Sequence, residues 1–160
     1  MIGGVLQLNG ADDYISTPAI LDFSAGDFSL FLWIKGGAPD QTIVSQENGS
    51  SWLMTNPADG ALRTNPRTPE VTGRNAKPAG PSLTSSTVVT DSDWHLVAFV
   101  RESNERILYV DDTEVARDTA ETLEPVVGGL YIGASSAMEP ADFFSGLIDD
   151  VRIYNVAVTR

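Results

Sequence analysis

The stretch that decides the fold is FFSGLIDDVRIYN, residues 143–155, close to the C-terminal end of the chain. Its side chains alternate with a period of two, which is typical of a β-strand with one face on a core. On this alternation Leu147, Asp149, Val151 and Ile153 share one face, which is apolar except for Asp149. A carboxylate directed into a core is costly unless it is paired, hydrogen-bonded or bound to a metal ion. The pattern therefore predicts a partner for Asp149.

The rest of the chain predicts an all-β protein. Short runs of Val, Ile, Leu, Thr and aromatic residues recur between Gly, Pro, Asp and Asn, and no long segment has the 3.6-residue period of a helix. Residues 28–35 are apolar on both faces, so we expect a central strand that is covered on both sides. Of the 160 residues 42% are hydrophobic, and no domain boundary is visible, which indicates one domain over residues 1–160. Further strands are expected at 4–10, 14–16, 42–45, 51–54, 61–64, 86–90, 94–101, 107–110, 114–116 and 130–133.

The composition excludes several classes of partner. There are 22 Asp and Glu residues against 10 Lys and Arg, a net charge of −12, whereas a nucleic-acid binder needs a basic face. No apolar run approaches the roughly 20 residues that span a bilayer, so no membrane partner is expected. The chain has no cysteine and no secretory signal pattern, which fits an excised domain or a protein assembled inside a cell.

Residues 65–83 differ from their surroundings. They contain four prolines and few apolar residues, which indicates a long surface loop. Bases gather there on an otherwise acidic chain, and we expect Arg67 and Arg74 to face a ligand, an acidic partner or the acidic segment 111–124 of a second copy.

Several ordered segments together resemble the laminin G-like members of the concanavalin A-like lectin/glucanase superfamily. The resemblance covers nearly the whole chain, and it implies a jelly-roll β-sandwich of two curved antiparallel sheets, with an extracellular, cell-surface or virion location. One departure is Asp112, where the family usually has Gly; the turn must then tolerate Asp at positive φ. The segments that carry the resemblance are NGADDYI (9–15), FSLFLWI (28–34), DWHLVAFVR (93–101), LYVDD (108–112), LYIG (130–133) and FSGLIDDVRIYN (144–155).

Catalysis is not expected from the acidic residues. Glycosidases that resemble this architecture carry Glu and Asp at alternating positions of one strand, and no Glu-x-Asp strand is present here. The close acidic pair Asp91 and Asp93 lies in a predicted turn, and the single histidine, His95, is interpreted as structural. With one histidine and no cysteine, a zinc site is excluded.

Calcium is the metal that this residue set favours, because it takes carboxylate and carbonyl oxygens. The resembled family often binds a structural ion where the first turn meets the last strand. This implies Asn9, Asp12, Asp13 and Asp149 as ligands. The open alternative is that backbone N–H groups or hydroxyls hold the Asp149 carboxylate.

A non-catalytic recognition module for glycans or a protein surface is the function that the sequence favours. Sugar binding needs an exposed aromatic ring with polar groups around it, and Trp52, Tyr131 and Tyr109 are the candidates. The alternative is a structural, decoration or adhesion protein of a phage virion or other surface assembly, which includes a homo-oligomer.

Overall fold

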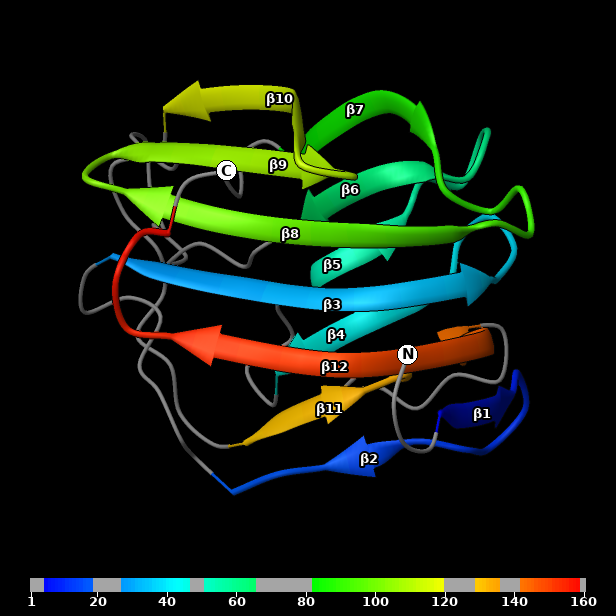
Figure 1. Cartoon of the computed structure of the whole chain (residues 1–160). Helices are drawn as coiled ribbons and strands as arrows, with labels where there is room; N and C mark the ends of the chain where they lie inside the picture. The colour runs from blue at the N-terminus through cyan, green and yellow to red at the C-terminus, as the bar shows by residue number, and fades with distance from the viewer. Residues whose placement is uncertain are drawn as a thin grey trace, which may run out of the picture.

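The computed structural model describes residues 5–18, 27–46, 51–65, 82–119, 129–135 and 142–158, and these residues form twelve β-strands (Figure 1). In this part of the chain no helix is long and apolar enough to cross a membrane. The strands are β1 (Leu6–Asn9), β2 (Ile15–Ser16), β3 (Phe28–Gly36), β4 (Thr42–Gln46), β5 (Ser51–Thr55), β6 (Ala61–Asn65), β7 (Leu83–Val88), β8 (Trp94–Glu102), β9 (Glu105–Val110), β10 (Thr113–Thr119), β11 (Leu130–Ile132) and β12 (Ser145–Tyr154).

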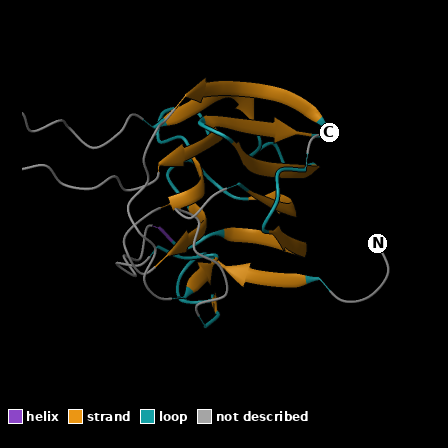
Figure 2. Ribbon diagram, turned by 90° about the vertical axis from the view of Figure 1, so that its left-hand side faces the viewer, coloured by secondary structure: helices purple, strands orange, loops and turns teal. Residues whose placement is uncertain are grey.

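The strands pair into two antiparallel sheets of six. The front sheet has the order β1-β12-β3-β8-β9-β10, and the back sheet, behind it in Figure 1, has the order β2-β11-β4-β5-β6-β7. Because β1 and β2 are consecutive yet lie in different sheets, as do β11 and β12, the chain crosses between the layers. Strands make up most of the described chain in Figure 2. The predicted all-β jelly-roll sandwich is confirmed.

A single apolar core fills the space between the sheets. Alternate residues of β3 and β8 point inward, and Leu30, Leu32, Val97 and Phe99 are fully buried there. Burying a Leu or Ile side chain contributes about 1.5–3 kcal/mol, so these alternating positions account for much of the stability. Leu8 from β1 joins this core.

β12 contains a bulge that changes which face its residues occupy. Asp149 pairs with Trp33 and Arg152 pairs with Phe31, so β12 has one residue more than β3 between these two pairs. Ile148 is buried in the core, whereas Asp149 is only half-buried and lies opposite Trp33 on the outer side. The predicted inward direction of Leu147 and Asp149 is therefore wrong, although Val151 and Ile153 do pack on the core. A one-residue bulge shifts a period-two pattern by one face.

The outer face of the front sheet carries a second apolar layer, the outer cluster of Phe31, Ala98, Val100, Ile107 and Tyr109. In Figure 1 the segment after β12 turns up past β3 to the arrowhead of β8. Ala157 and Val158 pack on the cluster. The expected cover on the second face of β3 is therefore supplied at one end of the strand by the chain's own C-terminal segment.

Candidate functional site

A pocket opens on the outer face of the front sheet, beyond the part that the C-terminal segment covers. We call it the front pocket; its volume is about 250 Å³. Its apolar lining comes from β3 and β8, where Trp33 and Leu96 are half-buried and Phe31 is buried. Its polar lining consists of three exposed side chains, Asp112, Asp150 and Arg152.

The bulge in β12 supplies one side of this pocket. Asp150 has φ +52°, the left-handed conformation that Asp tolerates better than most residues. The carboxylate of Asp150 then accepts a hydrogen bond from Arg152 Nε at 3.0 Å, and its second oxygen lies 2.9 Å from Arg152 Nη2 in an ion pair. Bulges often redirect a side chain next to a functional site, and here the bulge places an ion pair beside Trp33.

The hairpin turn between β9 and β10 supplies the opposite side. Asp111 and Asp112 have φ +53° and +66°, as a two-residue turn with two left-handed residues requires. The departure from Gly at position 112 is thus accommodated in the way the sequence predicted. Asp111 Oδ1 accepts the backbone N–H of Leu96 at 3.0 Å, and the N–H of Asp111 is donated to the Leu96 carbonyl at 2.8 Å. These bonds hold the turn, and with it Asp112, against β8.

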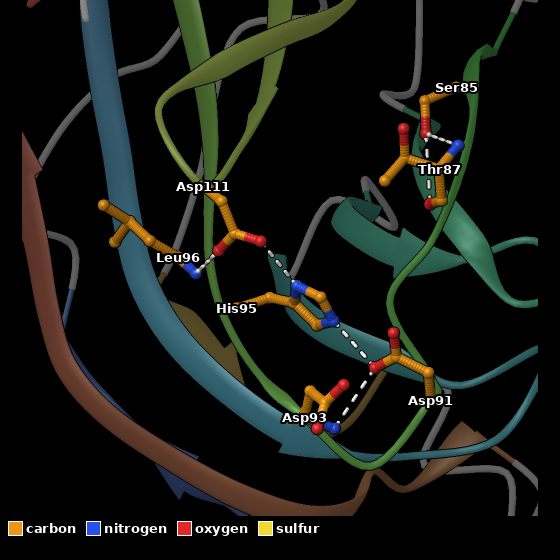
Figure 3. A network of polar contacts seen from close by, with 7 residues as sticks. All are labelled: Ser85, Thr87, Asp91, Asp93, His95, Leu96 and Asp111. Carbon is orange, nitrogen blue, oxygen red and sulfur yellow. Dashed lines mark hydrogen bonds and ion pairs between the residues drawn. The ribbon is translucent and has the colours of Figure 1, made fainter.

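His95 adds a second anchor to the same turn (Figure 3). Its Nδ1 atom lies 2.8 Å from Asp111 Oδ2 and its Nε2 atom lies 2.7 Å from Asp91 Oδ1. A neutral imidazole has one N–H, so only the imidazolium ion donates to both carboxylates. Burial by itself lowers the pKa of His95, but the hydrogen bonds to Asp111 and Asp91 outweigh it and raise that pKa above its usual value. His95 is therefore a structural residue, as predicted.

Two aromatic residues proposed as sugar platforms are buried, so that prediction is wrong for both. Trp52 has no exposed surface; its ring packs against Phe28 and Phe99, and its Nε1–H donates to Gln46 Oε1 at 2.8 Å. Tyr109 is 4% exposed and belongs to the outer cluster. Alternation along a strand does not reveal these positions, because both faces of the front sheet are apolar and the bulges in β5 alter its pattern.

The predicted calcium ligands of the first turn lie together. Asn9 Oδ1 accepts the N–H groups of residues 11, 12 and 13, while Asn9 Nδ2 donates to Asp12 Oδ1 and the Asn9 N–H donates to Asp13 Oδ2. Gly10 is required here, since its φ is +72° and a Cβ atom would lie 2.5 Å from the Cβ of Ser145. Within the described ranges no group of three or more Asp, Glu, His or Cys residues is arranged to hold a metal ion.

Asp149 is remote from that turn. Asn9 pairs with Ser145 on β12, and Asp149 stands four residues further along the same strand. At about 3.3 Å per residue the separation is roughly 13 Å, whereas ligands of one calcium ion each lie about 2.3–2.6 Å from it. The prediction that Asp149 shares an ion with Asn9, Asp12 and Asp13 is therefore wrong, and calcium binding by the turn alone stays a prediction.

The remaining predicted ligand residues divide into two groups. Tyr131 on β11 is half-buried and meets the exposed ring of Tyr14 edge-on, with centroids 6.0 Å apart, so its role stays a prediction. Arg67 and Arg74, with most of the 65–83 loop, lie outside the described residues.

Sequence reasoning missed Trp33, Asp112, Asp150 and Arg152 as residues of one site. The sequence signal that could have indicated this site is that residues 28–35 are apolar on both faces of the strand. Such a strand needs cover on both sides, and incomplete cover leaves an aromatic ring accessible. Only the tertiary structure shows that the C-terminal segment, in the part described up to Val158, packs on the outer cluster, which does not include Trp33.

The architecture and the site define a jelly-roll sandwich with an aromatic pocket on one sheet. The chain belongs to the concanavalin A-like lectin/glucanases superfamily, since a laminin G-type family model of that description matches residues 9–160. A comparison with curated protein sequences found no relative.

Solved structures with similar folds include three that carry binding domains or ligands. The binding domain of Paraclostridial Mosquitocidal Protein 1 has a TM-score of 0.71 and 14% identity, over 97% of this chain and 41% of the other. A putative carbohydrate binding protein from Bacteroides ovatus has a TM-score of 0.69 and 16% identity, over 96% and 45%. Domain 4 of AbnA, a GH43 extracellular arabinanase from Geobacillus stearothermophilus in complex with arabinotriose, has a TM-score of 0.60 and 20% identity, over 99% and 73%. The chain thus spans less than half the length of the first two, and at these identities the likeness is one of fold.

Proposed function

We propose that this protein is a non-catalytic module that binds glycans through the front pocket. The observation that carries the proposal is the half-buried indole of Trp33, set between Asp112 on one side and the Asp150–Arg152 pair on the other. Small-molecule sites combine an apolar lining with a few oriented polar groups. An aromatic ring offers a flat apolar surface to the C–H face of a sugar, while carboxylates and a guanidinium can hydrogen-bond its hydroxyls.

The comparisons support this proposal by providing precedents. A protein described as a putative carbohydrate binding protein and a domain with a bound arabinotriose share the fold. Because one fold hosts many functions, the argument depends on the pocket and not on the sandwich.

The polar network around His95 supports the absence of catalysis. Asp91 Oδ1 accepts hydrogen bonds from His95 and from the Asp93 N–H, so the acidic pair that the sequence singled out serves to hold the turn before β8. His95 is engaged at both ring nitrogens. We expect incubation with any bound oligosaccharide to release no shorter products.

The test is binding of a glycan panel by the wild type and two single variants. Trp33→Ala should weaken binding at least tenfold for whichever oligosaccharide binds, while Tyr131→Ala, on the back sheet, should leave the affinity unchanged. Thermal melts of all three proteins would control for folding. If affinity fell in Tyr131→Ala and not in Trp33→Ala, the site would be at β11, and the front pocket would lose its role.

A further inference from the structure

The charge of the front pocket bears on the class of glycan that it takes. Of the six lining residues, Asp112 and Asp150 are acidic and Arg152 is basic, which gives a formal charge of −1. Arg152 is held by Asp150 through a hydrogen bond from Nε and an ion-pair contact from Nη2, so its charge is already balanced. An anionic ligand would have to compete with Asp150 for this guanidinium.

The surroundings of the pocket hold further charges of both signs. Asp149 pairs with Trp33 across the strands, and Asp111 directly precedes Asp112. His95 neutralises part of the charge of Asp111, and Lys35 lies two residues beyond Trp33 on the same side of β3. Exposed charges act over about 8 Å at physiological ionic strength. With His95 charged, these four neighbours cancel, so the formal charge at the pocket stays at −1, on a chain of net charge −12.

We propose that the front pocket selects neutral saccharides and rejects uronic-acid and sulfated ones. This inference rests on the proposed function. Sugar hydroxyls donate hydrogen bonds, and the carboxylate of Asp112 and the outer lone pairs of Asp150 are acceptors. A carboxylate or sulfate on the sugar would bring like charges together in a partly desolvated site. Placing unmatched like charges opposite each other is an established way to reject a competing ligand.

The experiment uses the full chain and oligosaccharide pairs that share a sugar backbone and differ chiefly in charge. A galacturonic acid trisaccharide and its fully methyl-esterified form are one such pair, and a glycan array with neutral, uronic-acid and sulfated members of equal length extends the comparison. For each neutral compound that binds, we expect at least tenfold weaker binding of its charged counterpart at low salt. The difference should narrow as salt rises, because the repulsion is screened.

Two variants test whether Asp112 and Asp150 cause the weaker binding of charged sugars. Asp112→Asn and Asp150→Asn retain size and suit the left-handed backbone, since Asn adopts that conformation readily. Each should raise the affinity for charged sugars relative to neutral ones, while Asp40→Asn, in a turn away from the pocket with φ +65°, should leave the ratio unchanged.

Three outcomes separate this inference from the proposed function. Preferential binding of neutral sugars that is lost in Trp33→Ala supports both. Equal or tighter binding of acidic sugars that is lost in Trp33→Ala overturns the charge selection and leaves the glycan site standing. Absence of any Trp33-dependent glycan binding overturns the proposed function, and the inference with it.

Discussion

His95 and Asp111 join the first residues of β8 to the turn between β9 and β10, with Nδ1 and Oδ2 2.8 Å apart. That turn is held by two left-handed Asp residues, a conformation that costs an L-residue about 1–2 kcal/mol. The charged hydrogen bond from His95 to Asp111 offsets part of this cost and keeps Asp112 at the edge of the front pocket. The stability of the turn therefore depends on the protonation of one imidazole.

The first prediction is a loss of stability on the alkaline side. The pKa of His95 is raised in the folded protein above the value near 6.5 of an unfolded chain. Its contribution is then fully present below about pH 6.5 and is lost as the pH rises through the raised pKa. Urea unfolding from pH 5.5 to 9 should show a declining free energy of unfolding. His95→Gln, which carries no titrating group, should remove that decline.

The chain has one histidine, so an NMR titration of its ring reports this pKa without ambiguity. A titration midpoint at or below pH 6.5 would show that the two carboxylates do not raise the pKa of His95, and would contradict this prediction.

The second prediction concerns Trp52. Trp52→Ala should destabilise the protein by about 3–5 kcal/mol, because it leaves a cavity in the core and removes the hydrogen bond from Trp52 Nε1 to Gln46. Chemical denaturation measures the change. Glycan affinity of the fraction that remains folded should be unaltered, in contrast to Trp33→Ala. A Trp52→Ala protein of native stability that lost binding would restore Trp52 as a ligand residue.

The third prediction concerns the attachment of the C-terminal segment. The buried hydroxyl of Ser29 donates to the Val156 carbonyl and accepts the Val158 N–H, both at 2.7 Å. Ser29→Ala removes both bonds and should cost about 1–3 kcal/mol. Hydrogen exchange should become faster at Val158 and over the outer cluster. Unchanged exchange there would show that Ala157 and Val158 hold the segment by apolar contact alone.

The fourth prediction separates Asp149 from calcium. Since Asp149 is half-buried outside the core, Asp149→Ala should change stability by less than about 1 kcal/mol. If calcium binds at the Asn9–Asp13 turn, chelation should lower the melting temperature of the wild type and of Asp149→Ala equally. At a hundredfold excess of calcium over Kd the loss would be about 2.7 kcal/mol. Asp12→Ala should abolish the response to chelator, and a wild-type midpoint that ignored the chelator would remove the ion.

The fifth prediction concerns self-association through the basic loop. If Arg67 and Arg74 contact the acidic 111–124 segment of a second copy, sedimentation should show an oligomer that dissociates as salt rises, because exposed ion pairs are screened. Arg67→Glu should give a monomer at low salt. A sedimentation coefficient that ignored both salt and the substitution would make the loop a passive connection.

The fold and much of the core followed from the sequence. The double apolar face of residues 28–35, the alternation of 94–101 and the ordered family segments were sufficient for a sandwich with Leu30, Leu32, Val97 and Phe99 inside. The predicted strand at 86–90 begins earlier, at Leu83, because Leu83 is buried in the core and pairs with Thr64. The structural role of His95 also followed, from its place on the same face as Val97 and Phe99.

The alternation of apolar and polar residues shows which side chains a strand buries as long as no bulge interrupts the strand. Here the sequence by itself determined the strands and their core.

The tertiary structure alone decided the site. One extra residue in β12 moved Asp149 out of the core and set Asp150 beside Arg152, and a period of two cannot reveal such a residue in advance. Up to Val158, the C-terminal segment packs on the outer cluster, which contains Phe31 and not Trp33, and the Trp33 ring lines the front pocket. The approach of β8 to the β9–β10 turn placed His95 between Asp91 and Asp111. Each of these is a contact between residues distant in sequence or a register shift, and such contacts form only when the two sheets and their connections pack together.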